Sequence, residues 1–135
     1  MRDKRLCVLA VAGLVLAAAP AVVAHHSFAA EFDPAKSVVL TGAVTKLEWT
    51  NPHARFAADI KDASGKVVAW NFELGSPSTL FRHGWTRNSL KPGDTVTVNG
   101  YPARDGSRLV NAVTVNLADG RKVFAGTSAD APTTK

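Results

Sequence analysis

Cysteine and methionine are almost absent from this chain of 135 residues, which contains one of each. Both stand near its beginning, as Met1 and Cys7. A chain processed beyond that region would therefore carry no thiol and no thioether. No disulfide could then cross-link the fold, and a copper(I) site built on sulfur ligands is excluded. We expect the hydrophobic core alone to stabilise the domain.

Catalytic signatures and strong charge are also missing. The sequence contains no G-x-S-x-G, no H-E-x-x-H and no glycine-rich phosphate loop, which are the motifs of serine hydrolases, zinc proteases and nucleotide-binding domains. The formal net charge is only +5, whereas a nucleic-acid-binding domain usually concentrates more positive charge on one face. The sequence therefore favours a protein that is neither an enzyme nor a nucleic-acid binder.

The beginning of the chain has the features of an export signal. Residues 2–5 supply three basic side chains, Leu6–Ala19 is an apolar run, and Val22–Ala24 offers small residues at a cleavage site. This order is typical of a secretory signal peptide. A membrane anchor is the alternative, but the apolar run is short for a span. We expect cleavage after Ala24, a periplasmic mature protein and no remaining membrane segment.

Two strands joined at a tight corner are predicted for residues 38–60. The apolar positions are even-numbered as far as residue 44, and they become odd-numbered at Leu47 and Trp49. Such a switch within one strand predicts a bulge near Thr45–Lys46. A long first strand that bends at its middle is what a small closed barrel needs.

Alternation of period two predicts the remaining strands and their inner faces. The expected inward residues are Ala54, Phe56, Ala58 and Ile60; Val68, Trp70, Phe72 and Leu74; Val96 and Val98; and Val113, Val115 and Leu117. Ser76-Pro77 is typical of a helix start, with Leu80 and Phe81 expected to pack inward and Gly84 to end the helix. Trp85 is expected to fill the core.

Three strands, a short helix and two more strands follow the order of the oligonucleotide/oligosaccharide-binding (OB) barrel. We predict an all-β, OB-like barrel of five to six strands with one short helix, the sixth strand being Arg121–Phe124. A small β-sandwich is the alternative. The expected organisation is a signal peptide (1–24), an N-terminal arm (25–37), the barrel (38–125) and a disordered tail (126–135).

Polar and aromatic residues near the corner form the first candidate site. The alternation directs His53 and Arg55 outward, Trp49 precedes the corner, and Asn71 is expected on the outer face of the third strand. Together these residues could contact a small ligand or a protein partner. The alternative is that His53 is a turn residue whose ring bonds a nearby carbonyl. Glu48 and Glu73 are expected to be solvated.

The second candidate site is a metal centre at the mature N-terminus. Cleavage after Ala24 would make His25 the first residue, so its α-amine and imidazole could chelate one metal. An imidazole from His26 or His53 would complete a histidine brace, and nitrogen ligands in tetragonal geometry favour copper(II). The alternative is a polar terminus that binds no metal.

Several segments together resemble a family of small exported bacterial proteins of unknown function. They are H-H-S-F-A-A-E-F-D, E-W-T-N-P-H-A, W-N-F-E-L-G-S-P and K-P-G-D-T-V-T-V-N-G-Y-P-A-R-D-G-S. The resemblance covers the mature chain to about Phe124 and implies no catalytic residue, because the family has no established activity. The sequence thus predicts an exported, non-catalytic binding module, with a copper(II)-binding protein as the alternative.

Overall fold

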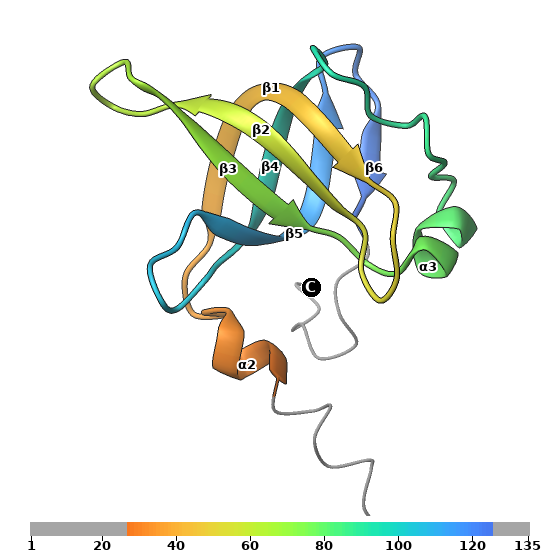
Figure 1. Ribbon diagram of the computed structural model, residues 1–135, viewed down its shortest axis with the longest axis horizontal. Coiled ribbons are helices and arrows are strands. Elements are labelled where there is room, and N and C mark those ends of the chain that lie inside the picture. The colour runs from red at the N-terminus through yellow and green to blue at the C-terminus, as the bar shows by residue number, and fades with distance from the viewer. Residues whose placement is uncertain (1–26, 126–135) are drawn as a thin grey trace, which may run out of the picture.

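The structure is a computed structural model and describes residues 27–125. The predicted signal peptide, His25, His26 and the predicted disordered tail lie outside this range. The elements, labelled in Figure 1, are α2 (Ser27–Glu31), β1 (Val38–Glu48), β2 (Arg55–Lys61), β3 (Val67–Glu73), α3 (Pro77–Arg82), β4 (Thr95–Pro102), β5 (Leu109–Leu117) and β6 (Lys122–Phe124). None of the helices in the described range is long and apolar enough to cross a membrane.

Five strands close into a barrel. β1 pairs antiparallel with both β2 and β4, and the antiparallel pairs β2–β3 and β4–β5 extend the sheet. The parallel pair β3–β5 closes the ring, and β6 adds an outer strand to β5. The predicted OB-like barrel is therefore confirmed, with a second short helix, α2, in the region predicted to be an arm.

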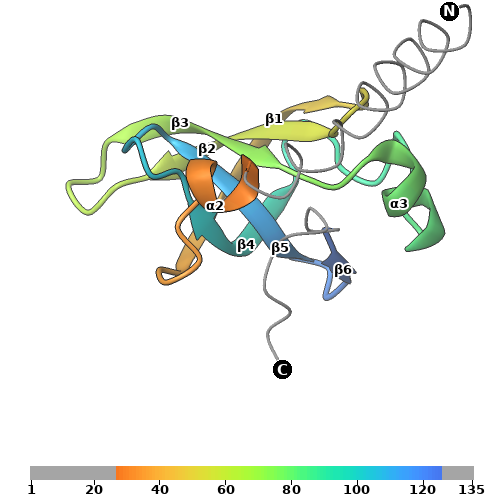
Figure 2. The same cartoon turned by 90° about the horizontal axis from the view of Figure 1, so that it is seen from below.

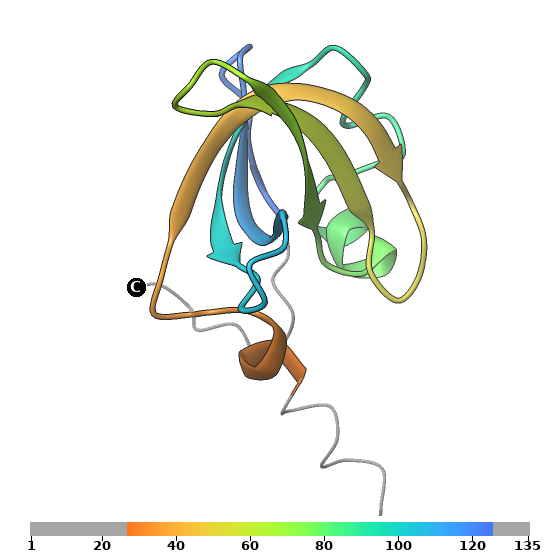
Figure 3. The same cartoon turned by 60° about the vertical axis from the view of Figure 1, so that its left-hand side comes forward.

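The first strand pairs on both sides because it bends strongly, as Figure 3 shows. Its register against β2 shifts between Val44 and Lys46, which confirms the predicted bulge. Gly42 lies against the neighbouring strand, where an added Cβ would approach the backbone oxygen of Asp59 to 2.1 Å. Only glycine fits this close approach of two strands.

The barrel interior contains most of the predicted inward residues. The alternating residues of β2, the central pair of β4 and the end of β3 are buried: Ala54, Phe56, Ala58, Ile60, Phe72, Leu74, Val96 and Val98. Trp85 is fully buried, as predicted, whereas Trp70 is only half-buried against the core. The inner face of β3 is thus well covered only toward its C-terminal end.

Helix α3 packs one of its two central apolar residues against the barrel core. Ser76 caps it by accepting a hydrogen bond from the Thr79 backbone, as predicted. Leu80 is fully buried, but Phe81 is 70% exposed, so the prediction that both pack inward was wrong for Phe81. Consecutive helical residues point about 100° apart, and this short helix has room for one of them against the core.

A second, smaller core lies outside the barrel, where α2 covers one end (Figure 2). Phe28 and Phe32 are buried there with Tyr101 and Ala103, and the rings of Phe28 and Tyr101 meet edge to face at 6.1 Å. Val113 packs against this cluster, so the prediction that Val113 shares the inner face of β5 with Val115 was wrong. The β4–β5 register shifts at Asn99/Gly100, which reverses the side-chain alternation.

Candidate functional site

The candidate site begins at the corner between β1 and β2. Residues 50–53 turn the chain beside α3, as Figures 1 and 3 show. Beyond the corner, Arg55 opens β2 and lies opposite Glu73 of β3. His53 therefore approaches the same point of β3 from the corner, and Arg55 approaches it from the neighbouring strand.

A buried carboxylate joins these two side chains. Glu73 is 4% exposed. Its Oε1 lies 3.1 Å from His53 Nδ1, and its Oε2 accepts a hydrogen bond of 3.0 Å from Arg55 Nη2. The prediction that Glu73 is solvated was therefore wrong. Opposite charges on directly facing residues of paired strands attract each other. Aligning the sequences of β2 and β3 as an antiparallel pair would have placed Arg55 opposite Glu73 and indicated this contact.

The carboxylate belongs to a row of residues that crosses four strands on the outer surface. Glu48, Arg55, Glu73 and Asn111 are successive partners across β1, β2, β3 and β5. Asn111 is 1% exposed, and neither its Oδ1 nor its Nδ2 has a hydrogen-bond partner within the described residues. Barrel closure places Glu73 of β3 beside the buried Asn111 of β5.

Three adjoining depressions follow this outer surface from the corner to the β4–β5 loop. Their volumes are about 190, 210 and 360 Å³, and all three are lined by Glu48 and Arg55. We call them together the β2–β3 groove. Its polar lining includes Lys46, Glu48, His53, Arg55, Asn71 and Arg108. The structure thus brings together three of the four predicted ligand-binding residues: His53, Arg55 and Asn71.

The groove carries surplus positive charge. The Lys46 ammonium donates a hydrogen bond to Glu48 Oε1. This contact and the charge of Lys46 lower the pKa of Glu48. Arg55 is satisfied on one side by Glu73, and Arg108 forms no ion pair with any described carboxylate. Sequence analysis missed Arg108 and Lys46, because only the fold places them beside Arg55.

Trp49 is separated from the other predicted residues. It lines a different depression of about 320 Å³ with Phe81, Thr86, Arg87 and Asn88, which we call the α3 face. Neighbouring positions in an extended chain point to opposite sides, so Glu48 contributes to the groove while Trp49 contributes to the α3 face. The predicted single site is therefore two surfaces on either side of the corner.

The proposed metal centre is described only in part. The residues from 27 to 125 contain no group of three or more His, Cys, Asp and Glu side chains that could hold a metal ion. His25 and His26 lie outside the described residues. His53 is half-buried, and the carboxylate of Glu73 lies beside its Nδ1, so Nε2 is the nitrogen that remains for another ligand.

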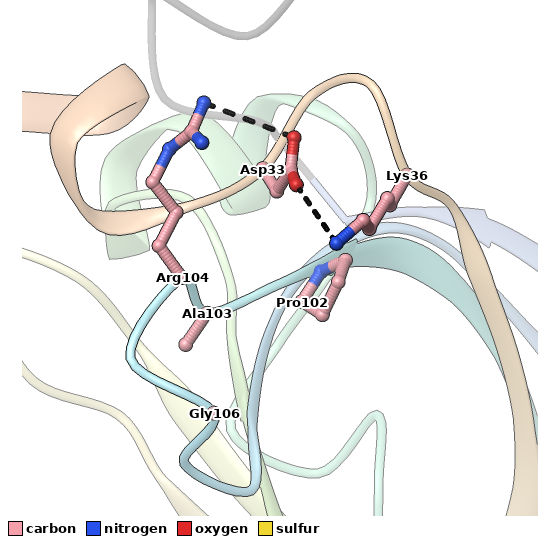
Figure 4. A pocket seen from close by; sticks show the side chains of 6 residues that line it. All are labelled: Asp33, Lys36, Pro102, Ala103, Arg104 and Gly106. Atoms are coloured by element: carbon pink, nitrogen blue, oxygen red, sulfur yellow. Dashed lines mark ion pairs between the residues drawn. The ribbon is translucent and has the colours of Figure 1, made fainter.

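Another depression, about 420 Å³, lies elsewhere, where the segment after α2 meets the end of β4. Figure 4 shows Asp33 between Lys36 and Arg104, with ion-pair distances of 3.6 and 3.8 Å. Arg104 also donates from Nε to the backbone oxygen of Ala29 at 2.7 Å. The contacts of Arg104 fasten α2 and the segment after it to the end of β4, which is a structural role.

The fold and the groove define a small closed β-barrel with a polar outer groove. Residues 12–112 match the family of unknown function DUF6152, and the chain belongs to this family. The match begins within the predicted export signal and ends in β5. A comparison with curated proteins found no match.

Proposed function

We propose that this protein is an exported, non-catalytic binding module whose β2–β3 groove recognises a small ligand, or a partner segment, through a carboxylate or phosphate group. One observation carries the proposal: the buried Glu73 holds His53 and Arg55 side by side at the groove. Export rests on the features of residues 1–24, which predict a signal peptide.

The arrangement favours binding because its donors are already ordered. Immobilising a long side chain on binding costs roughly 0.5–1.5 kcal/mol. The salt bridge to Glu73 already restricts the Arg55 guanidinium in the folded protein, so little further side-chain entropy is lost when a ligand binds. The remaining N–H groups of a guanidinium match the two oxygens of a carboxylate or phosphate. Arg108 and Asn71, farther along the groove, add a charge and an amide.

The position of the groove also supports binding. OB barrels use the face of strands two and three, between the β1–β2 and β4–β5 loops, to bind their ligands. In this chain the groove runs over β2 and β3 from residues 50–53 to Ser107 and Arg108. This support is an analogy between folds, and a fold alone does not fix a function.

The proposal is for binding and not for catalysis. A histidine oriented by a carboxylate acts as a catalytic base when a nucleophile lies within hydrogen-bonding distance of its other nitrogen. Within residues 27–125, no serine or threonine hydroxyl hydrogen-bonds the ring of His53. The sequence motifs of nucleophilic enzymes are missing as well.

Nuclear magnetic resonance titration tests this function. The processed protein would be titrated with inorganic phosphate, with acetate and with glucose as an uncharged control. We expect the two anions to shift amide signals of residues 46–57, 71 and 108, and Arg55→Ala to weaken that binding about tenfold. Arg121→Ala is the matched control, because Arg121 is an exposed arginine paired to Asp119 outside the groove. Equal binding by both variants would contradict the proposal.

A second candidate function, copper(II) binding at a histidine brace, is favoured by the geometry of His53. Metal-binding histidines commonly donate their second ring N–H to a carboxylate, which fixes the tautomer and the ring orientation. Glu73 lies beside His53 Nδ1 in this way. His25 would supply an amine and an imidazole only as the first residue of the chain.

The brace is tested by comparing the processed protein with a version that carries one extra methionine before His25. An extended chain loses the chelate, because the α-amine becomes an amide nitrogen. Copper(II) should bind the processed form much more tightly, with a different electron paramagnetic resonance spectrum. His53→Ala should weaken that binding, and His83→Ala should not. Identical spectra and affinities for the processed and extended forms would eliminate the brace.

A further inference from the structure

The α3 face combines an exposed aromatic side chain with a shallow depression, and it lies outside the groove. Phe81 is 70% exposed, more than the other exposed large apolar side chains that the structure describes, Val39 and Val67. Trp49, partly buried against the core, lines the same depression. The ring of Phe81 is thus presented to solvent beside a second aromatic surface.

The segment that forms this face carries charge of one sign. From Leu74 to Gly93 the chain has no aspartate and no glutamate, but it has Arg82, Arg87 and Lys91. None of these three side chains forms an ion pair with a carboxylate of the described chain, although the backbone N–H of Lys91 donates to Asp94 Oδ2 at 2.8 Å. Arg87 lines the depression itself. The cations near Phe81 therefore have no acidic partner within the described fold.

Anchoring residues hold this segment firmly while leaving Phe81 outside. Leu80 and Trp85 are fully buried and Leu90 nearly so, and the Trp85 backbone N–H bonds the Leu80 carbonyl at 3.0 Å. The exposure of Phe81 is therefore not the result of a loose helix. Exposed aromatic side chains with arginine beside them are the residue types enriched at the centres of protein interfaces.

We propose that the α3 face docks an acidic segment of a partner protein, which inserts an apolar side chain between Trp49 and Phe81. The depression of about 320 Å³ is at the lower limit of small-molecule pockets, which suits an inserted side chain. Complementary charge on the partner would steer its approach to Arg82 and Arg87. The concave shape favours a protruding peptide side chain over a flat lipid surface. This proposal does not depend on the function of the groove.

The probe for this surface is a blocked peptide in which a central leucine is flanked by aspartates. We expect it to shift amide signals of Trp49 and residues 81–88 and to leave residues 55, 71 and 108 unchanged. Phe81→Ser should weaken binding at least about tenfold, as for a residue central to an interface, and Arg87→Gln should weaken it several-fold. Val67→Ser, another exposed apolar residue, and Arg121→Gln are the matched controls and should bind like the parent protein.

Three results would overturn this proposal. The first is equal affinity for Phe81→Ser and Val67→Ser. The second is Phe81-dependent cosedimentation with phosphatidylglycerol vesicles, which would indicate a membrane surface. The third is self-association that Phe81→Ser abolishes, which would indicate a second copy of this chain. Because Phe81 is exposed, the variant should keep the circular dichroism spectrum of the parent, and Arg87→Gln tests the same surface without altering an apolar residue.

Discussion

The β2–β3 groove and the α3 face lie on either side of one corner, yet they differ in how their charges are satisfied. In the groove, Glu73 is bound by His53 and Arg55, and Lys46 bonds Glu48. On the α3 face, the basic side chains have no carboxylate partner in the described chain, and Phe81 is 70% exposed.

This difference separates two ways of preparing a surface for binding. Charges that are paired inside the fold fix the geometry of a site before the ligand arrives. Charges that lack an internal partner leave electrostatic attraction available for a second molecule. The groove is therefore suited to selecting a carboxylate or phosphate group by the fixed position of its donors, and the α3 face to attracting an acidic chain.

The largest expected effect concerns the residue that anchors the α3 segment. Trp85→Ala should lower the free energy of unfolding by about 3–5 kcal/mol, because a fully buried tryptophan leaves a large cavity. Trp70→Ala is the matched comparison and should cost about 1–2 kcal/mol, because the Trp70 side chain is half-buried. Urea unfolding of both variants measures the difference. Equal losses would show that the α3 segment is not anchored as described.

The next effect concerns the carboxylate that organises the groove. Glu73→Gln should lower the free energy of unfolding by about 1–3 kcal/mol, because a neutral amide has only one oxygen in place of the two carboxylate oxygens that lie against His53 and Arg55. Glu48→Gln is the matched control and should leave it nearly unchanged, since Glu48 is solvated. If the two substitutions were equally harmless, Glu73 would have no organising role.

A smaller effect concerns the start of α3. Ser76→Ala should cost about 1 kcal/mol, because the Ser76 hydroxyl accepts from the Thr79 backbone N–H at 3.2 Å. Ser78→Ala, two residues along the chain, removes only an exposed hydrogen bond between the two hydroxyls and should cost less. Thermal unfolding of the two variants makes the comparison, and a larger loss for Ser78→Ala would contradict the capping assignment.

The smallest effect is electrostatic and is confined to the rim of the groove. Lys46 lowers the pKa of Glu48 in the folded protein. A carboxyl with a lowered pKa stabilises the fold above its ordinary pKa, and the stabilisation is lost as the pH falls through the lowered value. Lys46→Ala should therefore raise the pKa of Glu48 in a carbon-13 titration. Lys36→Ala, which removes a partner of Asp33, should leave it unchanged.

Local patterns in the sequence predicted much of the fold. Period-two alternation located the strands, the parity switch near Thr45–Lys46 located the bulge, and Ser76-Pro77 located the start of α3. These features depend on neighbours within one or two strands. The prediction that Glu73 is solvated was wrong, because alternation assigns a side chain to a face of a strand but does not show what packs around it. The parallel pairing of β3 with β5, which joins distant segments, sets the surroundings of Glu73.

The candidate site was predicted only in part, because local patterns do not reveal which distant segments meet. Alternation placed His53, Arg55 and Asn71 on one outer surface, but Trp49 faces α3 across the corner. Arg108 reaches the groove from the β4–β5 loop, and only the closed barrel brings it there. Phe81 faces solvent because Leu80 occupies the single inward position of a short helix.

Phosphate binding by the Glu73→Gln variant tests the central claim most directly. If the groove acted only through its net charge, removing a carboxylate would tighten the binding of an anion. If Glu73 acts by holding His53 and Arg55 in place, the same substitution should weaken phosphate binding several-fold, although every positive side chain remains. Titration of the parent protein, Glu73→Gln and Glu48→Gln under identical conditions separates the two. Tighter binding by Glu73→Gln would contradict the account.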